Sequence, residues 1–237
     1  MESATEQAGV ALVDESGALG AVTVTRGRRH AEVIVPAVDF VCRRAGVTLS
    51  DVEAVVVDVG PGLFTGLRVG VGTAKALAFA LGRPLVGVSS LEVLAQAVAG
   101  AGVVAGTVVV PVVDARRGEV FAARFGVEAH RAVRLGEDVR RTPDALAAEL
   151  AVANGEPMLV VGDGARRHAA VFDAVPGVRR GDATTDHPSP VVLGALGLAR
   201  AGAGEGADPG AVLPHYLRGA DVRINWERRA RRAGAGA

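Results

Sequence analysis

Residues 52–68 have the sequence VEAVVVDVGPGLFTGLR. The apolar, β-branched run from Val52 to Val59 predicts a strand that is buried on both of its faces. Gly60, Pro61 and Gly62 break this run, and an apolar helix is expected from about Gly66 to Leu81. A buried strand that leads through a glycine-rich turn into a helix indicates an α/β protein.

The elements before and after this stretch complete a first lobe. Two strands, at 8–13 and 18–25, are joined by a predicted hairpin turn at 14–17, and a helix is expected at 30–44. A short strand at 84–88 precedes a helix, and Ser89 to Glu92 have the spacing of a capping box at its start. Because the first two strands form a hairpin, the sheets are expected to be mixed rather than all parallel.

A second lobe is predicted after the glycine-rich segment 100–106. Strands are expected at 108–113, 120–125 and 159–161, with a turn at 115–118 between the first two. Helices are expected after Thr142-Pro143 and at 189–201. The predicted organisation is an N-terminal lobe at 1–105, a C-terminal lobe at 106–218 and a flexible arginine-rich tail at 219–237.

Composition limits the classes of function. The chain has 237 residues, 49% of them hydrophobic, so a packed core rather than disorder is expected. Its formal net charge is zero, which argues against a protein that binds nucleic acid or membrane through overall charge. Cys42 is the single cysteine, which excludes an internal disulfide and a cysteine-based zinc site. The first residues lack the pattern of a signal peptide, and a cytoplasmic location without membrane association is expected.

Two predicted helices carry more apolar surface than one sheet can cover. In the helix at 30–44, only Asp39, Arg43 and Arg44 clearly favour water, and in the helix at 66–81 only Arg68, Thr73 and Lys75 are polar. One explanation is that both helices are buried between the lobes. The other is that they present an apolar face to another subunit, with small residues allowing close approach of the backbones.

The glycine-rich turn before the second of these helices is a candidate anion-binding loop. Gly60, Gly62, Thr65 and Gly66 lie where free backbone amides and the helix dipole can point toward an anion. The spacing differs from that of a phosphate-binding P-loop, which ends in Gly-Lys-Ser/Thr. From spacing alone, a tight turn that needs glycine for its backbone shape is the better explanation.

Several blocks of sequence together resemble one protein family. They are DVGPGLFTGLRVG at 58–70, TAK at 73–75, VGVSSLE at 86–92, DARRGEV at 114–120 and PHYLR at 214–218. Their order and spacing resemble those of the TsaB (YeaZ) family across nearly the whole chain. The resemblance implies a two-lobed actin/Hsp70/sugar-kinase-like (RNase H-like) fold with mixed sheets.

The resemblance also implies a function. In this family the chain is the dimerization subunit of the bacterial complex that makes threonylcarbamoyladenosine beside the tRNA anticodon. It binds and positions the catalytic relative TsaD, the ATPase TsaE joins them, and tRNA is reached through the complex. The two apolar helices are expected to pack with the matching pair of TsaD, or of a second copy. The interface residues predicted in this way are Val33, Ala37, Phe40, Val41, Val69, Gly70, Thr73, Ala74 and Leu77.

Departures from the catalytic relatives favour a non-catalytic subunit. Ser90 and Leu94 stand where TsaD has two histidines that bind its metal, and leucine cannot ligate one. The five histidines of this chain are scattered singly. The first hairpin lacks a phosphate-binding glycine after Glu2. No catalytic residue, metal or cofactor is therefore predicted, although a nucleotide at a subunit contact stays open. The alternatives are a kinase-like, nucleotide-dependent enzyme and a metallopeptidase-like protein of the same superfamily.

Two further expectations concern the start of the chain and the predicted interface. The family begins with a strand just before the position of Glu2, so we expect the true start to lie several codons upstream of Met1, which intact-mass measurement of the native protein would test. We also expect a large charged residue at Gly70 or Ala74 to abolish binding of TsaD while the monomer stays folded.

Overall fold

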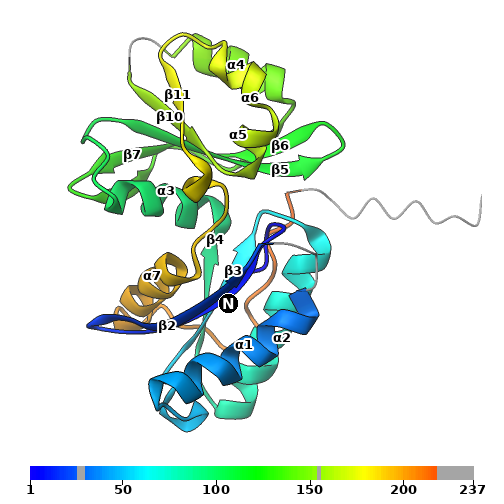
Figure 1. The fold of residues 1–237 in the computed structure, drawn as a ribbon, viewed down its shortest axis with the longest axis vertical. Coiled ribbons are helices and arrows are strands. Elements are labelled where there is room, and N and C mark those ends of the chain that lie inside the picture. Colours follow the sequence, from blue (N-terminus) through cyan, green and yellow to red (C-terminus); the bar gives the residue numbers. More distant parts are fainter. Residues whose placement is uncertain (26–29, 154–155, 218–237) are drawn as a thin grey trace, which may run out of the picture.

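The computed structural model describes residues 1–25, 30–153 and 156–217 and shows two lobes, one above the other (Figure 1). The predicted tail at 219–237 lies outside the described residues. In each lobe helices pack on both faces of the β-strands, which confirms the predicted two-lobed α/β fold with mixed sheets.

The lower lobe in Figure 1 begins with the antiparallel hairpin β1 (Ala8–Asp14) and β2 (Gly17–Val24). Next come α1 (His30–Ala45), a short 3-10 helix (Leu49–Asp51), β3 (Val55–Gly60), α2 (Phe64–Leu81) and β4 (Leu85–Ser89). Strands β3 and β4 are parallel. The segment before β1 joins the two pairs of strands, because Glu2 bridges to Gly9 and the carbonyl of Met1 accepts from the amide of Asp58 at 3.0 Å.

Strand β3 is covered on both faces, as its sequence predicts. Val55 and Val57 point into a core with α1 and α2, whereas Val56 packs on the other face against α7 (Pro190–Gly202). This alternation follows from the two-residue period of a strand. Helices α1 and α2 therefore lie together on one face of the lower sheet, and α7 lies on the opposite face (Figure 1).

The upper lobe contains a seven-stranded sheet in which the strands follow the order β11-β10-β5-β6-β9, with β7 paired to β5 and β8. Its strands are β5 (Val108–Arg116), β6 (Glu119–Ala122), β7 (Phe125–Glu128), β8 (Arg131–Arg134), β9 (Val139–Arg141), β10 (Met158–Val161) and β11 (Val178–Arg180). Helix α3 (Ser90–Gly100) packs on one face, and α4 (Pro143–Ala151), α5 (Asp163–Arg167) and α6 (Ala169–Asp173) pack on the other; a 3-10 turn, Ala183–Thr185, leads toward α7.

Helices α3 and α7 pack across the predicted division of the chain. Helix α3 precedes residue 106, yet its apolar side packs on β5 and β7 of the upper sheet. Helix α7 follows residue 106, yet it packs on β1, β3 and β4. The boundary between residues 105 and 106 stays a prediction. Helix α3, before this boundary, packs on the upper lobe, and α7, after it, packs on the lower lobe.

One local prediction is wrong. Ser89 is the N-cap residue of α3, but its side chain makes no capping hydrogen bond, and its Oγ is buried without a partner. The carboxylate of Glu92, which would complete a capping box, instead accepts from Arg200 Nη2 of α7 at 2.7 and 2.8 Å. The ion pair between helices thus replaces the local cap.

Candidate partner-binding site

Helices α1 and α2 lie side by side, and each has one side in the core of its own lobe. The buried residues of α1 are His30, Ile34, Ala37, Val41 and Cys42; those of α2 are Gly66, Leu67, Gly70, Val71, Ala74 and Ala78. Their spacing of three or four residues places them on one face of each helix. The opposite face of each helix is therefore free of the chain's own sheet.

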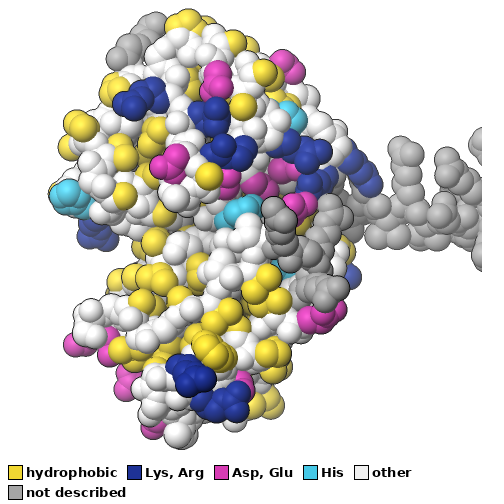
Figure 2. Space-filling view, viewed as in Figure 1, with side chains coloured by type: hydrophobic (Ala, Val, Ile, Leu, Met, Phe, Trp, Pro, Cys, Tyr) yellow, Lys and Arg dark blue, Asp and Glu magenta, His cyan; other side chains and the backbone are white. Residues whose placement is uncertain are grey.

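The outward face of this helix pair is largely apolar. On α2 it is formed by Thr65, Arg68, Gly72, Ala76, Phe79 and Ala80, all exposed. Phe79 is 83% exposed and Phe64, at the start of α2, is 46% exposed; on α1, Val35 is 58% and Phe40 is 47% exposed. In the space-filling view, hydrophobic side chains are spread over the lower lobe, where the two helices lie (Figure 2). Such a face is typical of a surface that binds another protein.

Helix α2 is also the described helix that is long and apolar enough, by length and composition, to cross a membrane. Only 33% of this 18-residue stretch is buried in the chain. Its buried third packs on β3, and the remaining residues of this apolar helix are half-buried or exposed among the described residues.

The residues predicted for the interface divide into three groups. Phe40 is exposed, as a contact residue must be. Val33, Val69, Thr73 and Leu77 are half-buried along the edges of the two helices. Ala37, Val41, Gly70 and Ala74 are buried in the chain's own core. As an interface, the whole set stays a prediction.

The expectation that a charged residue at Gly70 or Ala74 leaves the monomer folded is wrong. A Cβ at Gly70 would lie 2.1 Å from Ser3 Oγ, and Ala74 is fully buried. A large charged side chain at either position would be forced into the core of this chain before it met a partner. Exposed positions such as Ala76 can report on binding, because a side chain there points away from the sheet.

The glycine-rich loop before α2 packs against the first residues of the chain. A Cβ at Gly62 would lie 2.2 Å from the carbonyl oxygen of Ala4, and one at Gly66 would lie 2.0 Å from that of Ser3. The amide of Leu63 donates to the carbonyl of Ala4 at 2.6 Å. Glycine is thus required here for close backbone approach. Gly60 and Gly66 are buried, and Thr65 is exposed; an anion-binding role for the loop stays a prediction.

Two carboxyl groups lie fully buried behind this loop. Asp58 Oδ1 accepts from Ser90 Oγ at 2.6 Å and from the amide of Gly60 at 2.7 Å, and Glu2 Oε1 accepts from the amide of Ala4 at 2.7 Å. The second oxygen of each carboxyl, Asp58 Oδ2 and Glu2 Oε2, is buried without a hydrogen-bond partner. Because both side chains are 0% exposed, a substrate could not reach them in this conformation.

Burial is the main cause of a raised pKa in both carboxyl groups. It raises the pKa of Asp58 to about 6, against the opposing effect of the hydrogen bonds from Ser90 and Gly60. Burial also raises the pKa of Glu2 well above its ordinary value, and the negative charge of Asp58 raises it further. The pair is therefore a cost to stability whenever both carboxyls are ionised.

The histidines and the two α3 positions considered as metal ligands do not meet in one site among the described residues. Ser90 and Leu94 are buried on α3, with Leu94 in the core under the upper sheet. His30 and His187 contact Thr5, and the His215 ring lies 3.2 Å from Asp138. Over residues 1–25, 30–153 and 156–217, no three side chains of the metal-binding types come together as a ligand set. The absence of a metal and of a cofactor stays a prediction.

Ion pairs link the first loop to the hairpin of the upper sheet. Arg116 Nη2 lies 2.7 Å from Glu6 Oε1, and Arg116 Nη1 lies 2.9 Å from Asp114 Oδ2. The amide of Asp114 donates to Asp163 Oδ1 at 3.0 Å, and burial raises the pKa of Asp163 to about 6. The predicted turn of residues 115–118 thus ties the two lobes together in this conformation.

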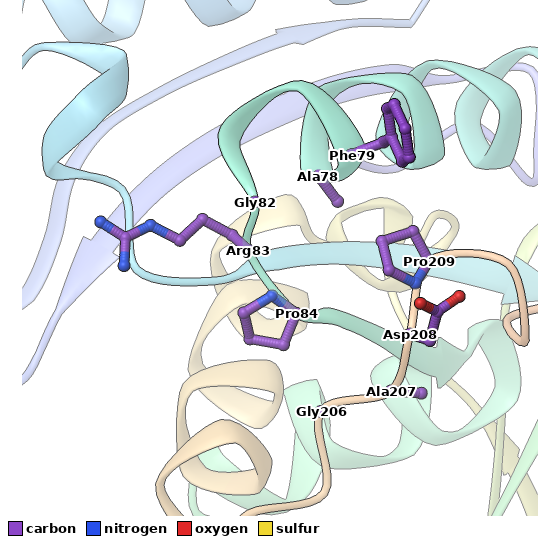
Figure 3. A pocket seen from close by; sticks show the side chains of 9 residues that line it. All are labelled: Ala78, Phe79, Gly82, Arg83, Pro84, Gly206, Ala207, Asp208 and Pro209. Atoms are coloured by element: carbon purple, nitrogen blue, oxygen red, sulfur yellow. The ribbon is translucent and has the colours of Figure 1, made fainter.

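A shallow pocket lies at the C-terminal end of α2. Its volume is about 440 Å³, and Figure 3 shows the side chains of Phe79, Pro84, Asp208 and Pro209 around it. The segment that contains Asp208 also pairs with β4 through a bridge between Leu85 and Ala207. The pocket continues the apolar face of α2 past its last turn.

Residues missed by the sequence analysis include Phe64, Gly72, Ala76 and Phe79, all on the outward side of α2. Tyr216, whose ring lies beside that of Phe64, was missed as well. The sequence could have predicted the outward face of α2, because Phe64, Arg68, Gly72, Ala76 and Phe79 follow one another at intervals of three or four residues. The position of Tyr216 had no such signal.

Similarity to known proteins shows the family of this two-lobed α/β chain. Residues 13–154 match the family model for TsaD, tRNA N6-adenosine threonylcarbamoyltransferase. The chain is 30% identical to the tRNA threonylcarbamoyladenosine biosynthesis protein TsaB of Bacillus subtilis, over 92% of each chain. An uncharacterized protein of Mycobacterium tuberculosis is 36% identical over 91% of this chain and 88% of its own length.

A solved structure agrees in fold. The chain superimposes with a TM-score of 0.77 on an uncharacterized protein of Pseudomonas aeruginosa that is described as similar to the peptidase YeaZ. The identity is 30%, and the match covers 92% of this chain and 97% of that one. The class of protein is thus a two-lobed, mixed α/β protein with the YeaZ-like fold. Within that class, the chain belongs to the TsaB (YeaZ) family.

Proposed function

We propose that this protein is a subunit of the machinery that makes threonylcarbamoyladenosine in tRNA. Its task is to bind and position the catalytic subunit, TsaD, and it carries out no chemistry of its own. The observation that carries this proposal is the apolar outward face of α1 and α2. The name of the Bacillus subtilis relative supports a role in the biosynthesis of threonylcarbamoyladenosine in tRNA. The match to the TsaD family model supports a partner whose fold is related to that of this chain.

The physical reason for a partner is the cost of leaving this face in water. Burial of apolar surface is favourable by about 25 cal/mol per Å². Exposed Val35, Phe40, Phe64 and Phe79 therefore favour association, and Gly72 and Ala76 let the backbone of a partner helix come close to α2. A second copy of the chain is the alternative occupant of the same face.

The remaining parts of the proposal follow from this role. TsaE is expected to join the pair as its ATPase, tRNA is reached through the complex, and the complex works in the cytoplasm. The buried carboxyls of Glu2 and Asp58 support a non-catalytic role, because their side chains lack access to solvent. A nucleotide at the subunit contact remains an open part of the proposal.

The test is assembly of this chain with the TsaD of the same cell. We expect Ala76→Arg to abolish co-purification, because it places a long charged side chain in the middle of the apolar face. Ala148→Arg is the matched control, since Ala148 is exposed on α4 of the upper lobe. Both variants should keep the melting temperature of the natural chain. If Ala76→Arg assembles as well as Ala148→Arg does, TsaD does not bind at this face.

A further inference from the structure

Three side chains from two distant segments meet at the N-terminal end of α2. The ring centroid of Phe64 lies 5.1 Å from that of Tyr216, with the rings tilted by 41°. The guanidinium carbon of Arg68, one turn further along α2, lies 4.1 Å from the centroid of the Phe64 ring. Phe64 is 46% exposed and Tyr216 is 41% exposed. The cluster thus presents aromatic surface and a positive charge to its surroundings.

Tyr216 is held in place by its neighbours on both sides. The amide of His215 donates to the carbonyl of Val59 at 2.7 Å, and the His215 ring lies 3.2 Å from Asp138 of the upper lobe. Leu217 packs against the core between α3 and the upper sheet. A side chain fixed in this way loses little conformational entropy when it binds a partner.

Arg68 differs from many arginines elsewhere in the described chain. Arg141, Arg180 and Arg200 each pair with a carboxylate, at 2.6, 3.0 and 2.7 Å. Among the residues that the structure describes, none forms a hydrogen bond or an ion pair with Arg68, and its guanidinium lies over the Phe64 ring. A guanidinium that lies over a ring can still donate hydrogen bonds from its N–H groups to a carboxylate.

The charge of the surrounding helix has one sign. From Phe64 to Leu81, helix α2 contains Arg68 and Lys75 and no acidic residue. Lys75 Nζ donates to the carbonyl of Gly210 at 3.1 Å, so it is turned toward the chain's own C-terminal segment. On α1, Arg44 lies over the Phe40 ring at 5.5 Å, a second arginine stacked on an exposed phenylalanine. Helix α1 also exposes Glu32 and Asp39, so the positive sign belongs to α2, and the part of a partner that complements α2 should carry acidic groups.

We propose that Phe64, Arg68 and Tyr216 form an anchor site for a carboxylate-bearing apolar segment of the protein partner. The apolar part of that segment packs on the two rings, and its Asp or Glu accepts hydrogen bonds from Arg68. This inference rests on the proposed function and names the chemistry of the partner. In a second copy, α2 offers no carboxylate, and the exposed acidic residues of α1, Glu32 and Asp39, already interact within the chain, so the anchor favours a partner of different sequence over self-association.

The experiment measures the dissociation constant for TsaD of the same cell at low and at high salt. We expect Arg68→Glu to weaken binding about 10- to 100-fold at low salt and to reduce its salt dependence. Tyr216→Ala should weaken binding about 10-fold, whereas Tyr216→Phe, which keeps the ring, should bind normally. Arg179→Glu, at an exposed position on β11, is the control for charge reversal.

The outcomes separate this inference from the proposed function. Normal binding by Arg68→Glu and Tyr216→Ala, with binding abolished by Ala76→Arg, would overturn the anchor and leave the proposed function standing. Normal binding by all three would overturn both. The anchor is also overturned if Arg68→Glu weakens binding of tRNA to the isolated chain and leaves binding of TsaD unchanged, because the cluster would then serve a phosphate. Each variant should have a melting temperature within a few degrees of that of the natural chain. Because Tyr216→Phe keeps the ring, it is the control for a folding defect in Tyr216→Ala.

Discussion

Asp58 is a fully buried carboxyl group whose ionised form is disfavoured by the fold. One of its oxygens is satisfied by Ser90 and Gly60, while the other is buried without a partner near a second buried carboxyl, Glu2. An unpaired, buried carboxylate is costly because water no longer solvates it. Asp58 therefore makes a pH-dependent contribution to stability.

The sign of that contribution follows from the shift of the pKa. Asp58 titrates near 3.8 in a solvated chain and near 6 in the folded protein, so folding favours its protonated form. The contribution is most favourable below pH 3.8 and is lost as the pH rises to about 6. We expect Asp58→Asn, which cannot ionise, to raise the free energy of unfolding at pH 8 by about 1–3 kcal/mol.

Denaturant unfolding at pH 4, 6 and 8 measures this effect. The difference between Asp58→Asn and the natural chain should grow from pH 4 to pH 8. Glu53→Gln, at an exposed position, should show no comparable trend. A difference that stays constant over this range, or a variant that is less stable at pH 8, would show that Asp58 is not held against ionisation.

The roles of single residues could be predicted from the sequence only where the backbone conformation requires a particular residue type. Gly62 and Gly66 were identified as turn glycines or anion ligands, and their tight contacts with Ala4 and Ser3 explain the first role. Glu2 and Asp58 were not predicted as a buried pair, because the strand contacts that join them connect residues far apart in sequence.

Helix α2 has two different faces, since one packs on the chain's own sheet and the other is exposed among the described residues. Two of its glycines make this contrast measurable. A Cβ at Gly66 would lie 2.0 Å from the carbonyl oxygen of Ser3, whereas a Cβ at Gly72 would meet nothing within 4 Å. The same substitution should therefore have opposite effects at the two positions.

We expect Gly72→Ala to stabilise the chain by about 0.5–1 kcal/mol, because alanine restricts the unfolded state and favours helix. Gly66→Ala should destabilise it by about 1–3 kcal/mol or more, because backbone atoms would have to move. Thermal or denaturant unfolding of the two variants measures both values. Equal effects at the two positions would contradict the assignment of an inner and an outer face to α2.

Long elements were predicted well, as were the short strands β4 and β10, whereas several other short elements were missed. The apolar patterns of α1, β3 and α2 gave boundaries within a few residues of the structure. The short strands β8, β9 and β11 and the five-residue helices α5 and α6 were missed. Segments of three to five residues carry no clear periodicity, and contacts with the rest of the sheet decide their conformation.

At the scale of the whole molecule, the sequence showed that α1 and α2 have excess apolar surface, but not which side of each helix is free. A helical wheel that is apolar on nearly every side cannot say which face the sheet will cover. Predicted contacts such as Ala37, Val41, Gly70 and Ala74 consequently lie in the core, and exposed Phe79 was overlooked. The C-terminal segment that brings Tyr216 to Phe64 could be located only from the fold.

In the working complex, we expect TsaD to cover the outward face of α1 and α2. Hydroxyl-radical footprinting of the free chain and of its complex with TsaD tests it most directly. We predict that Phe40, Phe64 and Phe79 lose most of their oxidation in the complex, while exposed Leu135 and Val152 of the upper lobe keep theirs. Unchanged oxidation of the three phenylalanines in a complex that has formed would contradict the account.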